Sequence, residues 1–130
     1  ADDADFMRMV LRRILEDGGH EVVGEADNGR DVIALYTMLH PDLVTLDITM
    51  PFLSGLEAAR RILEEHPDAR IVMVSAMGTR ESVNKARALG VKGFIVKPFR
   101  EEQVLSALRQ AQEGEEDDAP GPAFPETPFR

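Results

Sequence analysis

The chain has 130 residues, 43% of them hydrophobic, which fits one globular domain with an ordinary apolar core. The formal net charge is -9 and no concentrated basic patch is present, which argues against nucleic-acid binding. The sequence has no cysteine for a disulfide framework, and no apolar run approaches the roughly 18 residues of a membrane span. We therefore expect a cytoplasmic protein that binds neither nucleic acid nor a membrane.

The chain opens with ADDADFMRM, in which Asp2, Asp3 and Asp5 precede a helical pattern of apolar residues. The apolar positions of this pattern are Phe6, Met9, Val10, Ile14 and Leu15. We expect Asp5 to cap the helix, Gly18-Gly19 to end it, and Met9 to face the core.

Short apolar runs alternate with helical patterns along the rest of the chain. The runs typical of strands are 20–26, 42–47, 69–75 and 91–97. The helical patterns that follow them are centred on 32–39, 56–63, 83–89 and 104–108. This alternation predicts an α/β, doubly wound fold, in which a parallel sheet is covered by helices on both faces.

The composition changes near Glu113, where EGEEDDAPGPAFPETPFR begins. This stretch is acidic and rich in proline, which is typical of disorder. We expect a folded domain over residues 1–112 and a disordered tail or linker over 113–130.

Three polar residues end successive predicted strands, namely Asp47, Ser75 and Lys97. In parallel sheets, ligands bind beyond the carboxyl ends of the strands, so we expect these side chains to share one crevice. Each residue alone has an ordinary interpretation as a turn, cap or solvated charge. Together they offer a nucleophile or metal ligand, a hydrogen-bond donor, and a cation that neutralises a phosphoryl group.

The opening carboxylates belong at the same edge if Ala1 ends a strand. Asp2, Asp3 and Asp47 would then repel one another unless a cation compensates their charge. Mg²⁺ prefers such oxygen ligands, and with the lysine and hydroxyl it makes a site for phosphoryl transfer onto Asp47.

These motifs resemble the receiver domains of two-component response regulators, the CheY-like family, over residues 1 to about 112. The similarity rests on Asp2-Asp3, on Asp47 in LDITMP, on Ser75 in VSAMG and on Lys97 before Pro98-Phe99. LDITMP, SAMG and FIVKPF are most similar to chemotaxis-type, single-domain members. The resemblance implies a flavodoxin-like, five-stranded parallel sheet of order 2-1-3-4-5.

The resemblance also implies a phosphoacceptor and a metal site. Asp47 would accept a phosphoryl group from a sensor histidine kinase. Mg²⁺ would be held by Asp3, Asp47 and the backbone carbonyl of Thr49, with Asp2 acting through water.

A switch is implied by the same resemblance. Ser75 and Lys97 would each bind a phosphoryl oxygen, and the aromatic Phe94 would turn inward as the hydroxyl residue moves. The surface formed by residues 79–112 would then change its affinity for a downstream target, for instance a flagellar-motor component. The Lys97-Pro98 bond would be cis.

Two positions tune the lifetime of the aspartyl phosphate in this family, and here they are Thr49 and Met77. Neither is a strong general base, so we expect slow intrinsic dephosphorylation.

The family order places an apolar strand at the sheet centre, directly before Asp2-Asp3, where the given sequence has only Ala1. We expect this first strand to be missing from the given sequence; the alternative is a strand borrowed from another chain. If it is absent from the protein, we expect a destabilised fold and a displaced Asp2-Asp3 pair.

Two other functions stay open. The chain could be a receiver cut from a larger regulator with a DNA-binding or enzymatic output domain. It could also be an aspartyl-nucleophile phosphatase of the haloacid-dehalogenase type, although such enzymes want a second aspartate where this chain has Thr49.

Overall fold

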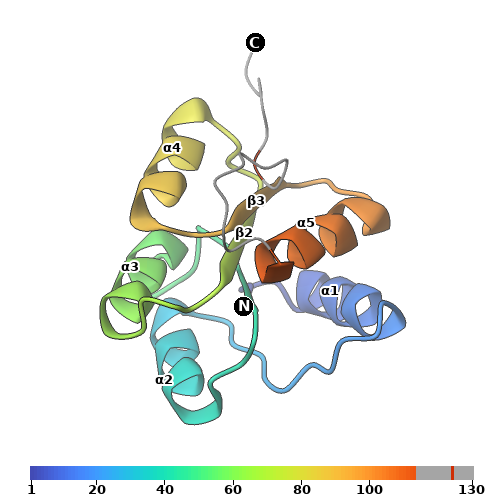
Figure 1. The fold of residues 1–130 in the computed structure, drawn as a ribbon, viewed down its shortest axis with the longest axis horizontal. Coiled ribbons are helices and arrows are strands. Elements are labelled where there is room, and N and C mark those ends of the chain that lie inside the picture. Colours follow the sequence, from blue (N-terminus) through green and yellow to red (C-terminus); the bar gives the residue numbers. More distant parts are fainter. Residues whose placement is uncertain (114–123, 125–130) are drawn as a thin grey trace.

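A computed structural model of the chain describes residues 1–113 and Phe124 (Figure 1). Its helices and strands are α1 (Asp5–Asp17), α2 (Gly29–Leu39), β1 (Val44–Leu46), α3 (Gly55–Glu65), β2 (Ile71–Ser75), α4 (Arg80–Leu89), β3 (Gly93–Val96) and α5 (Glu101–Glu113). Apart from Glu113 and Phe124, the predicted tail over 113–130 lies outside the described residues. Within the described part, no helix is long and apolar enough to cross a membrane.

The strands form a parallel sheet of order β1-β2-β3, which confirms the doubly wound α/β fold. The register pairs Val44 with Ile71 and Met73 with Phe94. Helices α2, α3 and α4 lie on one side of the sheet, and α1 and α5 lie on the other (Figure 1). Because the strands are parallel, their carboxyl ends meet at a single edge.

Strand β2 shows how the sheet supports two cores. Its residues are all buried, and successive side chains point to opposite faces. Ile71 and Met73 join the core under α2, α3 and α4, while Val72 and Val74 join the core under α1 and α5. The continuous apolar run over 69–75 is therefore explained by burial on both faces.

The strand predicted over 20–26 is wrong, because those residues form no strand. A strand needs a hydrogen-bonded neighbour, and here a groove separates this segment from β1. The described part of the chain consequently contains three strands, which correspond to the last three of the predicted five.

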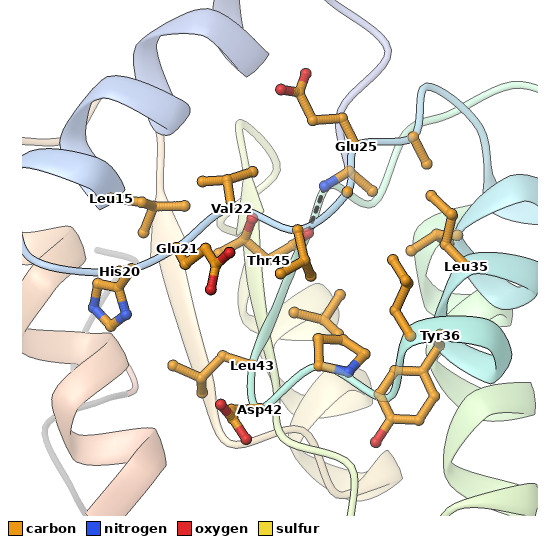
Figure 2. Close-up of a pocket in the computed structure, with 18 of the residues that line it drawn as sticks. Leu15, His20, Glu21, Val22, Glu25, Leu35, Tyr36, Asp42, Leu43 and Thr45 are labelled. Carbon is orange, nitrogen blue, oxygen red and sulfur yellow. Dashed lines mark hydrogen bonds between the residues drawn. The ribbon is translucent and has the colours of Figure 1, made fainter.

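The groove has a volume of about 420 Å³ and lies between residues 20–26 and the β1 segment (Figure 2). Figure 2 shows Val22 near Leu43 and Thr45, with Leu35 and Tyr36 of α2 on the far side. At one end of the groove, the Ala1 amino group donates a hydrogen bond of 2.7 Å to the Thr45 carbonyl. The lining mixes apolar side chains with polar ones, among them His20, Glu21 and Asp42.

Helix α1 differs from the prediction in two details. Its N-cap is Ala4, without a side-chain hydrogen bond, and Asp5 is the first helical residue. The buried apolar residue of the helix is Leu11, whereas Phe6 and Met9 are 67% and 58% exposed. Helical spacing alone did not fix which side of this apolar stripe faces the sheet.

Candidate functional site

The structure brings three carboxylates together at the carboxyl edge of the sheet. One oxygen each from Asp2, Asp3 and Asp47 lies within 4.8 Å of the others. Asp2 and Asp47 are buried, and Asp3 is exposed.

Backbone hydrogen bonds on two sides hold Asp2 in place. The Asp2 N–H donates to the Ala26 carbonyl at 3.1 Å, and the Asp47 N–H donates to the Ala1 carbonyl at 2.9 Å. Ala1 and Asp2 thus bridge the 20–26 segment and the end of β1. This one bridge fixes the acidic pair relative to Asp47.

Lys97 joins the two buried carboxylates. Its Nζ donates to Oδ2 of Asp2 at 2.7 Å and to Oδ2 of Asp47 at 3.3 Å. The Lys97 backbone N–H donates to the Ser75 carbonyl at 2.9 Å, and the peptide bond to Pro98 is cis, as the resemblance implied. The lysine that follows β3 therefore contacts carboxylates at the end of β1, on the other side of β2.

The charges in this site do not balance. Burial raises the pKa of the Asp47 carboxyl; Lys97 opposes that rise and the neighbouring Asp2 adds to it. Burial by itself would lower the pKa of Lys97, but hydrogen bonds and attraction from Asp2 and Asp47 raise it on balance. Three carboxylates share one ammonium group, so the site favours a further positive charge.

The donor set suits a hard divalent cation. The oxygens of Asp2 accept close hydrogen bonds, at 3.0 Å from the Ala4 N–H and at 2.7 Å from Lys97. Those of Asp47 accept longer ones, at 3.4 Å from the Thr49 N–H and at 3.3 Å from Lys97, and Asp3 is exposed at the cluster. An Asp2 engaged in this way suits contact with a cation through water better than direct ligation. The residues present therefore fit Mg²⁺.

Ser75, Thr49 and Met77 surround Asp47 along the strand ends. Ser75 is buried, and its Oγ accepts a hydrogen bond of 3.0 Å from the Met77 N–H. The Thr49 N–H lies 3.4 Å from Oδ1 of Asp47, and the Thr49 hydroxyl donates to the Met77 sulfur at 3.6 Å. The two residues named as lifetime-tuning positions thus touch each other.

Phe94 on β3 is buried at 3% exposure and belongs to the core cluster to which α4 contributes Val83 and Ala86. The aromatic side chain therefore occupies an inward position in this structure.

Two residues that contribute to the site, Gly55 and Arg8, were not predicted from the sequence. A Cβ on Gly55 would lie 1.8 Å from the Asp47 carbonyl oxygen, so only glycine fits where α3 begins. Arg8 donates from Nη1 to the Asp2 carbonyl at 2.8 Å. Ser54 directly before Gly55 is a helix-start signal that could have pointed to Gly55, because serine caps the helix there. Nothing in the linear sequence pointed to the contact of Arg8 with Asp2.

Comparison with known proteins agrees with this geometry. The family model "Response regulator receiver domain" matches residues 1–109. Chemotaxis protein CheY of Thermotoga maritima is 48% identical over 109 residues, which are 84% of this chain and 91% of that protein. CheY of Bacillus subtilis is also 48% identical over 109 residues, with the same two coverages. A crystal structure of a CheX–CheY–BeF3–Mg²⁺ complex from Borrelia burgdorferi matches with a TM-score of 0.79 at 36% identity, covering 81% of this chain and 80% of that one.

The chain therefore belongs to the family of response regulator receiver domains. Within that family it is a chemotaxis-type response regulator of two-component signal transduction, similar to CheY proteins over most of its length.

Proposed function

We propose that Asp47 accepts a phosphoryl group from a sensor histidine kinase. The observation that carries this proposal is the position of Lys97, whose ammonium group contacts both Asp2 and Asp47. A carboxylate nucleophile with a fixed cation beside it, at the edge of a parallel sheet, suits charge stabilisation during phosphoryl transfer.

In the transfer step, an oxygen of Asp47 attacks phosphorus, the bond from phosphorus to the donor nitrogen breaks, and the imidazole leaves. Lys97 neutralises charge on one phosphoryl oxygen, and the Ser75 hydroxyl donates to another. Asp3, Asp47 and the Thr49 carbonyl would hold Mg²⁺, with Asp2 supporting it through water. Bound there, the ion would add to the charge neutralisation that Lys97 provides.

The chain acts in this proposal as a regulator, with at most weak self-phosphorylation from small donors and weak self-dephosphorylation. Phosphorylation adds charge and acceptor oxygens at Asp47, and Ser75 and Phe94 transmit the change to the surface formed by residues 79–112. That surface then binds a downstream target. A CheX-like protein is one candidate, because the Borrelia relative is seen in complex with CheX; a flagellar-motor component is another.

The proposal is tested with acetyl phosphate and Mg²⁺. The wild-type chain should gain one acid-labile phosphoryl group, and Asp47→Asn should gain none. Asp42→Asn is the matched control, because Asp42 lies at the opposite end of the β1 segment and should leave labelling unchanged. Equal labelling of Asp47→Asn and wild type would refute the assignment.

A further inference from the structure

Phe124 is the one described residue beyond α5, and it lies against α4. The Cζ atom of Arg87 sits 4.6 Å from the centroid of the Phe124 ring, which is within the range of a cation–π contact. The Phe124 side chain is half-buried and packs against the core cluster that contains Val83 and Ala86 of α4. Phe124, which is distant in sequence, thus has a defined contact site on α4.

Charge around this contact site favours an acidic segment. The exposed side of α4 and the turn before β3 carry four cations against the single acid Glu81, which pairs with Lys85 at 3.3 Å. These cations are Arg80, Lys85, Arg87 and Lys92. The chain between α5 and Phe124 is acidic in sequence, with Glu115, Glu116, Asp117 and Asp118. Opposite charges of this kind raise the rate of encounter and fix the choice of partner.

We propose that the surface of α4 around Arg87 is a docking site for an aromatic side chain in an acidic segment, and that Phe124 of this chain is its resident occupant. This inference rests on the proposed function, because α4 forms part of the surface that would bind the downstream target. A target of the same chemistry must displace Phe124 before it reaches Arg87. Phe124 therefore acts as a built-in competitor.

Tethering decides how strong this competition is. A segment tethered to the same chain as its site meets that site at an effective concentration on the order of millimolar. A separate acidic peptide of similar intrinsic affinity therefore competes poorly at micromolar concentration. An exposed cation–π contact is weak, so removing the Phe124 ring should raise the apparent affinity of such a competitor about two- to fivefold.

The first test locates the contact in the full-length chain by amide NMR spectra. Phe124→Ala should shift the amide signals of Arg87 and its neighbours on α4, because the ring current is lost. Phe129→Ala, which removes an identical side chain from the same tail, should leave those signals unchanged. Unchanged α4 signals in Phe124→Ala, or equal changes in Phe129→Ala, would overturn the inference.

The second test uses a synthetic peptide of residues 113–130 added to the full-length chain. The peptide should bind Phe124→Ala more tightly than wild type, with shifts centred on Arg87, and a peptide carrying alanine at position 124 should lose that binding. Equal binding to both proteins would contradict the proposed competition. Labelling of the same proteins with acetyl phosphate separates the two proposals. If the wild type takes up no label, the phosphoacceptor assignment is wrong. If labelling is normal but the α4 amide signals do not shift, only the docking of Phe124 is wrong.

Discussion

Two regions that meet at Ala1, the carboxyl edge of the sheet and the groove beside β1, differ in how closely their side chains pack. On one side, the carboxyl edge brings Asp2, Asp47 and Lys97 within hydrogen-bond distance. On the other side, the groove between residues 20–26 and β1 leaves about 420 Å³ without protein atoms (Figure 2). The functional edge is closely packed with charged groups, and the groove is open, with a lining of mixed polarity.

The site residues Asp47, Ser75 and Lys97 lie at the carboxyl ends of strands, whereas the groove lies beside β1. Three backbone hydrogen bonds of Ala1 and Asp2 are sufficient to align the acidic pair with Asp47. The core beneath the edge is supplied by β1, β2 and β3, and β2 pairs with a strand on each side. The groove and the edge should therefore respond differently to the same kind of change.

The largest difference is expected for the stability of the fold. Leu46 is 0% exposed beneath the site, and Leu46→Ala should lower the free energy of unfolding by about 3 kcal/mol, through lost burial and a new cavity. Leu39 lines the groove at 40% exposure, and Leu39→Ala should cost less than about 1 kcal/mol. Denaturant unfolding measures both, and equal losses would mean that the groove is packed as tightly as the sheet.

Mg²⁺ should stabilise the edge and leave the groove unaffected. A tenfold excess of Mg²⁺ over its dissociation constant raises the free energy of unfolding by about 1.4 kcal/mol. Asp47→Asn should abolish this gain, and Asp42→Asn beside the groove should keep it. Thermal unfolding with and without Mg²⁺ provides the measurement.

Asp47→Asn should also raise stability at neutral pH in buffer without Mg²⁺. The pKa of Asp47 is raised in the fold, first by burial. The stability from this group is therefore greatest below its unfolded pKa, and it is lost as pH rises through the folded pKa. The difference between variant and wild type should shrink as the buffer is made acidic, and a constant difference would contradict this.

A smaller effect is expected on the lifetime of the phosphorylated state. Thr49 and Met77 supply no general base, so the wild-type phosphoryl group should persist well beyond seconds. Met77→Glu places a carboxylate at the edge and should shorten the half-life several-fold. This acceleration is smaller than the one that an optimally positioned general base gives. Met38→Glu changes another exposed methionine, on α2 and away from the site, and should have no effect. Loss of label after removal of the phosphodonor gives the rates.

The smallest effect is expected for the exposed ion pairs of α3. Hydrogen bonds from Arg60 and Arg61 lower the pKa of Glu57 to about 2. The contribution of Glu57 to stability is present above its unfolded pKa and is lost as pH falls towards 2. Solvent screens these charges, so Glu57→Gln should shift the unfolding midpoint at pH 7 less than any variant above.

The sequence predicted the strand ends because each one follows a buried apolar run. Asp47, Ser75 and Lys97 could be located in this way, and parallel topology put them at one edge. The contact between Lys97 and Asp2 joins residues 95 positions apart, and no local pattern encodes it. The same limit explains the error over 20–26, where a suitable strand sequence lacks the neighbour that a strand requires.

The close approach of Gly55 to Asp47 limits which residues position 55 can accept. Its N–H donates to the Ile48 carbonyl at 2.7 Å, and its Cα hydrogens face the Asp47 backbone too closely for any side chain. A saturation-mutagenesis scan should therefore reject substitutions at position 55 as strictly as those at the phosphoacceptor. A residue without functional groups would then score as though it were chemically active, because the position of the nucleophile depends on the space that it leaves empty.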